Sequence, residues 1–538
     1  MRALLRVVGG RFGPTGAVAA LETAVRSAAA RASARAAADR WLRTVLPVAA
    51  VLGLASFVRF WHLADVGFNS DEAVYAGTAA SIAGDDTMRS MFPVFRAHPV
   101  LFQAILSIGL RGGVDDWTAR AFPAAFGVAT VAVTYLLGRR LYGHAAGLVA
   151  ALLLAVMPYH VVVSRQVLLD GLMTLCATGT LYCVARYAET VTLRWLIAAG
   201  GVMGLTVLSK ETALILLGGV YAFVALTPVV RLRGRHLLLS IVTMVVVIAV
   251  FPVVLSAAGR IGTGQHYLLW QIFRRPNHGL LFYFSAVPTA IGLAVIAAGL
   301  LGLVWLRGEN TWRERLLVCW MVVPVLFFTL WPVKGYQYLL PIAPVLAVLA
   351  GRTLSRLPSL PLSDPQWWPR AAPAALAVVF VTVSLAVPTA ARVDPTTSSG
   401  TFLAGTGGLP GGREAGEWVG QNVPYGAELL TIGPSIANVL QFYGHRRVRA
   451  LSVSANPRSR NPAYTPVPNP DRALRNGEFQ YLVWDSYTAN RTPFFAEKAR
   501  KLVERYHGVA VFTATVPVRA GSGVSEQPVI VIYEVSTS

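Results

Sequence analysis

Residues 237–256 read LLLSIVTMVVVIAVFPVVLS, an apolar run without Asp, Glu, Lys or Arg. Wound as a helix, a run of this length spans about 30 Å, the hydrocarbon thickness of a bilayer. Comparable runs recur from Val45 to Ala390 and then stop. The chain is 55% hydrophobic and 14% charged, with a mean hydropathy of +0.55. These values exclude an ordinary soluble protein and predict a polytopic α-helical membrane protein.

Positive charges predict the orientation of these helices. The formal net charge of +21 comes largely from arginines in short loops between apolar runs, which indicates membrane topology and not nucleic-acid binding. Because basic segments stay inside, residues 1–43 are predicted to form a cytoplasmic, partly helical tail on anionic lipid. The alternating arginine clusters predict about eleven transmembrane helices, with the C-terminus outside, at residues 44–61, 121–138, 145–163, 171–185, 195–208, 212–230, 237–256, 280–306, 316–331, 337–350 and 371–390.

Three regions follow: a basic tail at 1–43, a transmembrane module at 44–392 and an extracytoplasmic α/β domain at 393–538. The first external loop covers about 62–119, and its apolar residues 99–110 are too short to cross the bilayer. In the last region we expect helices at 414–421, 435–443 and 494–506, and strands at 428–432, 481–484, 509–515 and 529–535. Residues 456–470, with five prolines, are expected to be irregular.

Ionisable side chains gather at the outer ends of the spans and in the first external loop. Charges near the membrane are costly and are retained mainly for function. The set predicts an active site at the external membrane boundary, and its members are Asp71, Glu72, His98, Arg165, Asp170, Lys210, Glu211 and Lys334.

Each of these residues also has a structural explanation. Asp71 and Glu72 begin a helix, where a capping box and the helix dipole favour acidic residues without any catalytic duty. Arg165 and Asp170 flank a turn and could pair with each other or cap the next helix, and the same holds for the adjacent Lys-Glu pair at 210–211. Lys334 could extend to the interface beside neighbouring tyrosines. Local sequence leaves both explanations open.

The order of the motifs along the chain helps to choose between the structural and the catalytic explanation. The motifs are Asp71-Glu72-x-x-Tyr75, His98-Pro99, Arg120-Ala121-Phe122-Pro123, Gly138-Arg139-Arg140, Ser164-Arg165 to Asp170, Leu208-Ser209-Lys210-Glu211, and Lys334 to Tyr338-Leu339-Leu340-Pro341. Together, over about residues 44–350, they resemble the GT-C glycosyltransferases. The nearest branch is that of the protein O-mannosyltransferases and lipid A aminoarabinose transferases.

The resemblance implies an inverting glycosyltransferase with a polyprenyl-phosphate-linked sugar as donor. In this family, the acidic residue of the first external loop faces the acceptor. Such a carboxylate can accept the proton of the attacking acceptor hydroxyl. The implied catalytic residues are Asp71 as base, Glu72, which orients Asp71 or caps the helix, and Asp170, which would bind acceptor, sugar or a divalent metal ion. Cations offset charge on the departing phosphate, and the candidates for this contact are His98, Arg165, Lys334 and Tyr338. Further candidates are Tyr75, Lys210 and Glu211. No cofactor is implied with certainty, and a divalent metal is the one considered.

Several points stay open. Aminoarabinose transferases usually show Lys-Pro where this chain has His98-Pro99, so mannose, another hexose or a pentose all fit. The acceptor can be a protein hydroxyl, a glycolipid or a glycan, in the plasma membrane or cell envelope. The alternative is a transporter or flippase, which predicts repeated halves that the sequence does not show. In the last region, the basic patch at 445–449 is explained either as a solvated turn or as an acceptor site, and the turn is favoured.

Overall fold

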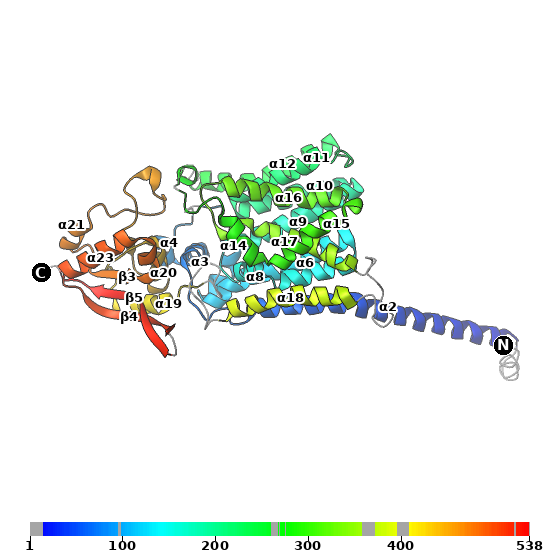
Figure 1. The fold of residues 1–538 in the computed structure, drawn as a ribbon, viewed down its shortest axis with the longest axis horizontal. Coiled ribbons are helices and arrows are strands. Elements are labelled where there is room, and N and C mark those ends of the chain that lie inside the picture. Colours follow the sequence, from blue (N-terminus) through cyan, green and yellow to red (C-terminus); the bar gives the residue numbers. More distant parts are fainter. Residues whose placement is uncertain are drawn as a thin grey trace. The chain divides into compact units, whose positions relative to one another are not determined.

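The computed structural model describes residues 14–94, 98–259, 267, 270–274, 276–357, 372–394, 408–520 and 523–536. Contacts divide the chain into two units, Met1–Gly53 and Leu54–Ser538. In the first unit the described residues are helical from Pro14 onward. The second unit holds the elements from α3 onward, many of which are labelled in Figure 1.

Helices dominate residues 54–393 (Figure 1). They are the end of α2 (Pro14–Phe60), α6 (Asp116–Tyr142), α7 (His144–Ala155), α8 (Pro158–Ser164), α9 (Leu169–Thr190), α10 (Leu193–Ser209), η2 (Glu211–Ile215), α11 (Leu216–Leu226), α12 (Gly234–Ala257), α14 (Phe282–Ile291), α15 (Leu293–Trp305), η3 (Arg307–Glu309), α16 (Trp312–Leu330), η4 (Tyr336–Ile342), α17 (Ala343–Arg356) and α18 (Ala372–Val393). Each of the eleven expected segments coincides with a helix or with two consecutive helices.

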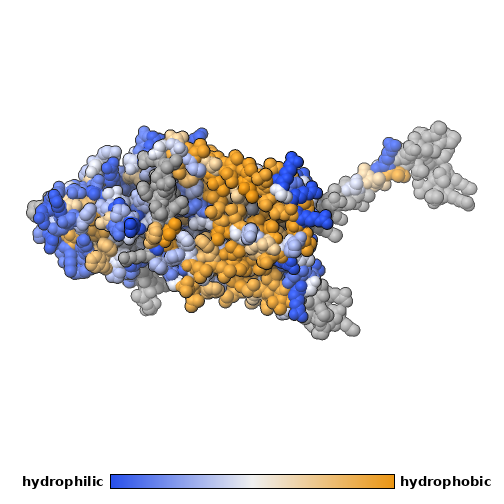
Figure 2. Space-filling view, turned by 90° about the horizontal axis from the view of Figure 1, so that it is seen from above, coloured by the Kyte–Doolittle hydropathy of each residue, from blue (hydrophilic) through white to orange (hydrophobic). Residues whose placement is uncertain are grey.

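By length and composition, fewer than the eleven predicted segments qualify as transmembrane helices. Among the described residues, four helices are long and apolar enough to cross a bilayer, or up to six if the bent pairs α7–α8 and α14–α15 each count as one. The number eleven therefore stays a prediction. Figure 2 shows apolar side chains covering the surface of the helical region, whereas the surface of the C-terminal region is mainly hydrophilic. The predicted fold class, a polytopic helical membrane protein with a small C-terminal α/β domain, is confirmed.

Glycines allow three membrane helices to pack closely. A Cβ on Gly138 of α6 would lie 2.9 Å from the Cα of Gly147 in α7. A Cβ on Gly351 of α17 would lie 2.5 Å from the carbonyl oxygen of Ala146. In lipid, such small residues bring helix backbones into van der Waals contact, which replaces the hydrophobic driving force available in water. These contacts join α6, α7 and α17 into one layer.

Residues 62–119, the predicted first external loop, contain short helices: α3 (Ser70–Ala83), α4 (Asp86–Met91), α5 (Leu101–Gly109) and the 3-10 turn η1 (Leu110–Gly112). The start of α3 is fixed by a capping box. The Asn69 side chain accepts the backbone N–H groups of Asp71 and Glu72, and the Glu72 carboxylate accepts the backbone N–H of Asn69. These three backbone donors are thereby satisfied, and Asp71 is held in the first turn.

The tail domain, residues 408–536, is built around a five-stranded sheet in the order β2-β1-β3-β5-β4. Its strands are β1 (Leu429–Thr431), β2 (Val448–Ala450), β3 (Tyr481–Asp485), β4 (Val509–Ala520) and β5 (Gly523–Glu534), and its helices are α19 (Gly412–Asn422), α20 (Pro434–Gly444), α21 (Pro470–Arg475), α22 (Ser486–Arg491) and α23 (Pro493–Arg505). The pairs β2–β1 and β1–β3 are parallel, and β5 runs antiparallel to β3 and β4. Strand β2 and the helices α21 and α22 are too short to stand out in the sequence; residues 456–470 contain one short 3-10 turn, at Pro457–Ser459.

Alternation along the central strands creates two cores. Leu430 and Leu482 pack with Leu502 of α23 on one face of the sheet. Leu429 and Val483 face the other way and join a cluster with α19 and α20. This second cluster also contains apolar residues of the first external loop, which come from α3, α4 and α5. The tail domain and the first external loop thus share one hydrophobic core. The predicted boundary at 393 stays a prediction, because residues 395–407 lie outside the described residues.

Candidate active site

A cavity of about 500 Å³ lies among the first external loop, the segment around residues 267–277, residues 333–338 and the tail domain. Its polar lining includes Asp71, Tyr75, His98, Lys210, Tyr267, Arg274, Asn277, Lys334, Tyr338, Ser435, Ser452, Arg460, Asn461 and Tyr464. The structure therefore brings together the predicted residues Asp71, Tyr75, His98, Lys210, Lys334 and Tyr338. It leaves Glu72, Arg165, Asp170 and Glu211 outside the lining.

Asp71 presents an unpaired carboxylate to this cavity. Its backbone N–H is bound to Asn69, but no described residue donates a hydrogen bond to its side chain, which is exposed. Protein atoms surrounding the cavity limit hydration, and this desolvation raises the pKa of Asp71; the nearby charges of Lys210, His98 and Arg274 oppose the rise. A carboxylate with a raised pKa accepts a proton more readily than an ordinary one. Asp71 therefore has the properties of a general base.

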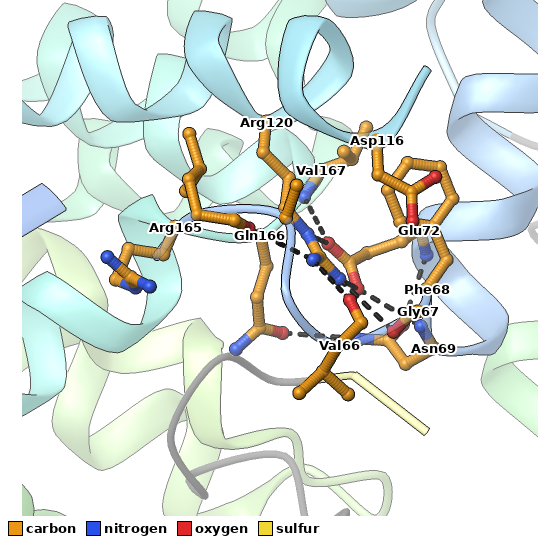
Figure 3. A network of polar contacts seen from close by, with 12 residues as sticks. Val66, Gly67, Phe68, Asn69, Glu72, Asp116, Arg120, Arg165, Gln166 and Val167 are labelled. Carbon is orange, nitrogen blue, oxygen red and sulfur yellow. Dashed lines mark hydrogen bonds and ion pairs between the residues drawn. The ribbon is translucent and has the colours of Figure 1, made fainter. Parts of the chain in front are cut away.

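Glu72, next in sequence, has a different environment. Its side chain is fully buried and receives Nε and Nη2 of Arg120 at 2.7 and 2.8 Å and the backbone N–H groups of Asn69 and Val167 (Figure 3). All four contacts hold the carboxylate away from the cavity. The prediction that Glu72 is catalytic is not supported by this geometry. Its capping role, which the sequence left open, matches the contacts.

Asp170 and Lys210 form a buried ion pair, with Lys210 Nζ 2.9 Å from both carboxylate oxygens. The Lys210 ammonium also lies 4.8 Å from the centroid of the Tyr338 ring. Because the Asp170 carboxylate is engaged in this pair and does not line the cavity, its predicted contact with acceptor, sugar or metal is not supported. Lys210 contributes to the cavity wall as one half of a neutral pair.

His98 is held on both ring nitrogens. Nδ1 lies 2.9 and 3.0 Å from the Glu211 carboxylate oxygens, and Nε2 lies 3.1 Å from the Tyr267 hydroxyl. The Tyr267 hydroxyl in turn accepts a hydrogen bond from Gln271 at 2.7 Å. The Tyr75 and His98 rings meet edge to face, with centroids 6.0 Å apart. Glu211 therefore contacts His98 and does not line the cavity, and His98 links α3 to the segment that carries Tyr267.

Three cations in the lining have no carboxylate partner among the described residues: Lys334 and Arg274 of the membrane module, and Arg460 of the tail domain, which donates to the Ala455 carbonyl. Lys334 donates from Nζ to the Trp331 carbonyl at 2.8 Å, and its backbone exchanges two hydrogen bonds with the Asn277 side chain, both at 2.8 Å. An ammonium has three donors, so Nζ retains two for a ligand. Arg274 lies over the Trp270 ring at 4.8 Å and, within the described part of the chain, forms no ion pair. Sequence reasoning missed Arg274, although its position four residues after Trp270, between two apolar runs, was a usable signal.

Arg165, a predicted phosphate contact, lies outside the cavity lining and binds backbone carbonyls. Its guanidinium donates to the carbonyls of Val58, Arg59, Trp61 and His62, at the end of α2. These carbonyls have no partner within the helix, and a cation at a helix C-terminus is favourable. Figure 3 shows Arg165 directed away from the Glu72–Arg120 pair. The phosphate-binding prediction for Arg165 is therefore not supported by its position.

The tail domain supplies a hydroxyl-rich wall through Ser435, Ser452, Asn461 and Tyr464. The basic patch at 445–449 does not line the cavity. Its members bind the domain itself: Arg446 donates to the carbonyls of Val423 and Gly420, whereas Arg449 pairs with Glu428 and Glu478.

As for a metal site, no group of three or more His, Cys, Asp or Glu side chains gathers anywhere in the described ranges.

Comparison with known proteins identifies this arrangement. The crystal structure of ArnT from Cupriavidus metallidurans superimposes with a TM-score of 0.64, covering 92% of this chain and 98% of that one at 18% identity. The chain has the GT-C fold. A second GT-C relative, the oligosaccharyltransferase AglB from Archaeoglobus fulgidus, gives a TM-score of 0.55 over 90% of this chain and 74% of its own, at 14% identity.

Sequence comparison points to the same GT-C group. Residues 97–256 match the family described as dolichyl-phosphate-mannose-protein mannosyltransferase. An undecaprenyl phosphate-alpha-4-amino-4-deoxy-L-arabinose arabinosyl transferase from Pectobacterium carotovorum is 27% identical over 202 residues. That match covers 35% of this chain and 36% of the relative. The predicted resemblance to GT-C glycosyltransferases, in the branch of these two groups, is confirmed.

Proposed function

We propose that the protein transfers a sugar from a polyprenyl-phosphate donor to an acceptor hydroxyl, with inversion, at the outer face of the membrane. The observation that carries this proposal is the composition of one cavity: the unpaired carboxylate of Asp71 shares it with the unpaired cations Lys334 and Arg274. A carboxylate opposite cations is what a reaction needs when it removes a proton at one end and releases a phosphate at the other.

The relatives support the choice of donor. ArnT has been crystallised with undecaprenyl phosphate, and a solved structure of AglB contains a dolichol-phosphate and an inhibitory peptide. Both ligands are polyprenyl phosphates, which combine a long apolar chain with a phosphate group. In this chain, apolar helices lie beside a polar cavity with an excess of cations. The same class of ligand fits that combination.

In the proposed reaction, the acceptor oxygen attacks the anomeric carbon of the sugar from the side opposite the phosphate. Asp71 accepts the hydroxyl proton as the new C–O bond forms. The bond between the anomeric carbon and the phosphate oxygen breaks, and its electron pair leaves with the polyprenyl phosphate. Lys334 and Arg274 stabilise the charge that develops on that phosphate. His98 and Tyr338 complete the wall of the cavity, and no step of this scheme requires a metal ion.

The sugar and the acceptor are proposed only as classes. One related group is named for mannose transfer and the other for an aminoarabinose, so the sugar is a hexose or pentose of this kind. The wall formed by Ser435, Ser452 and Tyr464 offers hydrogen bonds to an acceptor without placing a carboxylate near it. A glycan, a glycolipid or a protein hydroxyl would each fit. The tail domain thus acts as a cover over the acceptor side of the cavity, which we propose lies outside the cytoplasm.

The test is transfer of radiolabelled sugar from synthetic polyprenyl-phosphate-mannose and polyprenyl-phosphate-aminoarabinose to endogenous acceptors. Membranes would contain the wild-type chain, Asp71→Asn, Asp86→Asn or vector alone. Asp86 is a matched control, because it lies in the same loop but pairs on the surface with Arg89. We expect transfer by the wild type and Asp86→Asn and none by Asp71→Asn. Equal transfer by Asp71→Asn would remove Asp71 as the base. Passage of labelled donor across the membrane without transfer would favour the transporter.

A further inference from the structure

The residues leading into α3 are held from two sides. Residues 63–69, called here the entry loop, connect the end of α2 to Asp71. On one side Arg120 of α6 donates to the carbonyls of Leu63, Val66 and Gly67 at 3.1, 2.6 and 3.3 Å. The same guanidinium binds Glu72. One buried arginine thus fixes both the entry loop and the first turn of α3.

The tail domain holds the entry loop from the other side. The Tyr443 hydroxyl of α20 accepts the backbone N–H of Phe68 at 2.8 Å and donates to Asp116 at 2.6 Å. Arg413 of α19 pairs with the same Asp116 oxygen and donates to the Ala64 carbonyl. Asp116 lies one turn before Arg120 on α6, so the two clamps share a helix.

Side-chain packing and charge both favour the close contact between the tail domain and the entry loop. Phe68 is fully buried, and its ring centroid lies 5.1 Å from that of Phe442. A Cβ on Gly67 would lie 2.7 Å from the Arg413 Cβ, so the tail domain approaches the entry loop as closely as a glycine permits. Burial, reinforced by the Asp116 carboxylate, raises the pKa of Tyr443 well above its ordinary value. Its hydroxyl therefore stays protonated and available as a donor.

We propose that Tyr443, Arg413 and Asp116 are positioning residues that fix the Asp71 carboxylate in the cavity by clamping the entry loop between the tail domain and α6. The proposal rests on the proposed function for its kinetic consequence, but the clamp itself is a structural statement that can be tested alone. None of the three residues lines the cavity, so they act through the backbone between Phe68 and Asp71.

The test compares two tyrosines of the tail domain in the full-length protein, reconstituted in nanodiscs. Tyr443→Phe removes only the hydroxyl that joins Phe68 to Asp116. Tyr506→Phe is the matched control, because the Tyr506 hydroxyl also binds an aspartate, Asp471, but the Tyr506 ring packs in the other core, with Leu430, Leu482 and Leu502, which contains no residue of the entry loop. Hydrogen exchange of a peptide covering residues 63–75 is measured first. We expect faster exchange in Tyr443→Phe and wild-type exchange in Tyr506→Phe, since lost local contacts lower local stability.

The kcat and the donor KM of sugar transfer are then measured on the same samples. Misplacement of a reacting group by a fraction of an ångström slows chemistry, so we expect kcat of Tyr443→Phe to fall by about tenfold or more. The donor KM should stay within about twofold, because donor contacts are untouched. Arg413→Lys, which keeps the charge, serves as the second variant if Tyr443→Phe does not fold, and it should change exchange and kcat in the same direction.

Each outcome decides the proposal. Faster exchange with a lower kcat and an unchanged KM supports it. Wild-type exchange, or faster exchange with wild-type kcat, overturns it, as does an equal effect of Tyr506→Phe. If the wild type transfers no sugar from any polyprenyl-phosphate donor, the proposed function fails, and the exchange comparison alone decides whether the clamp exists.

Discussion

Replacing Glu72 by glutamine separates a structural carboxylate from a catalytic one. Glutamine keeps the size of the side chain but removes the charge that faces Arg120 in a fully buried site. Leaving one partner of a buried ion pair uncompensated costs about 3–5 kcal/mol. Arg120 keeps the entry-loop carbonyls of Leu63, Val66 and Gly67 as acceptors, so we expect the lower end, about 3 kcal/mol.

The hydrogen-bond geometry adds a second, smaller loss of stability in Glu72→Gln. The two Glu72 oxygens accept from Arg120, Asn69 and Val167, and every one of these partners is a donor. A glutamine amide nitrogen must therefore face another donor, and an unsatisfied buried donor costs about 1–3 kcal/mol. The double variant Glu72→Gln/Arg120→Gln leaves no uncompensated charge. We expect it to be more stable than Glu72→Gln alone.

The assay has two parts. The free energy of unfolding is measured by SDS titration in mixed micelles, and sugar transfer is measured per folded molecule under single-turnover conditions. We expect a large loss of stability with a transfer rate within about tenfold of the wild type, because general acid–base catalysis contributes about 10²–10⁴-fold and Glu72 takes no part in it. A stable variant whose transfer rate falls by more than a hundredfold would refute the reasoning and restore Glu72 as a catalytic group.

Three further predictions concern charges around the cavity. Asp71 must be ionised to accept a proton, and desolvation by the protein atoms around the cavity raises its pKa, so kcat should fall as the pH drops through a value above that of an ordinary carboxyl group, as a pH–rate profile will show. Arg274→Gln and Lys334→Met should each raise the donor KM by about 10–100-fold, since a hydrogen bond to a charged group is worth about 1.5–3 kcal/mol; steady-state kinetics measure this. Arg165→Met should leave the donor KM unchanged but lower the melting temperature, because the carbonyls at the end of α2 lose their donor.

Local signals in the sequence were sufficient for the secondary structure. Each apolar run became a helix or a bent pair, because length and hydrophobicity act within one segment. The capping box at Asn69 and Glu72 formed as its spacing indicates, which placed Asp71 in the first turn of α3. In the tail domain, alternation revealed β3 and β5, whereas β2 has three residues and offers too short a pattern to recognise.

Partners across the chain could not be predicted in the same way. Glu72 and Arg120 are 48 residues apart, and Asp170 and Lys210 are 40 apart, so no local periodicity relates them. Before the helices are packed, a buried charge that is paired looks the same as one that faces a cavity. Arg165 illustrates the difficulty, because its acceptors are backbone carbonyls that carry no sequence signature.

The pairing of charges explains why some candidates belong to the supporting frame and others to the reaction. A buried charge without a partner is too costly to keep, so Glu72 and Asp170 are neutralised by Arg120 and Lys210. Among the described residues that the membrane module gives to the cavity, Asp71, Lys334 and Arg274 have no such partner, and water or a ligand must solvate them. In this part of the lining, one anion and two cations leave one positive charge, which a donor phosphodiester of charge −1 balances; Arg460 of the tail domain adds a further cation.

Transfer of the sugar preserves that balance. The leaving group becomes a phosphate monoester with a charge of about −2 near neutral pH, while Asp71 takes up the acceptor proton and becomes neutral. The two cations of Lys334 and Arg274 then match the phosphate. Charge moves across the cavity during the reaction without a change in the total, so the surrounding ion pairs need not rearrange. For this electrostatic reason we assign the reaction to the unpaired residues and the support of the site to the paired residues.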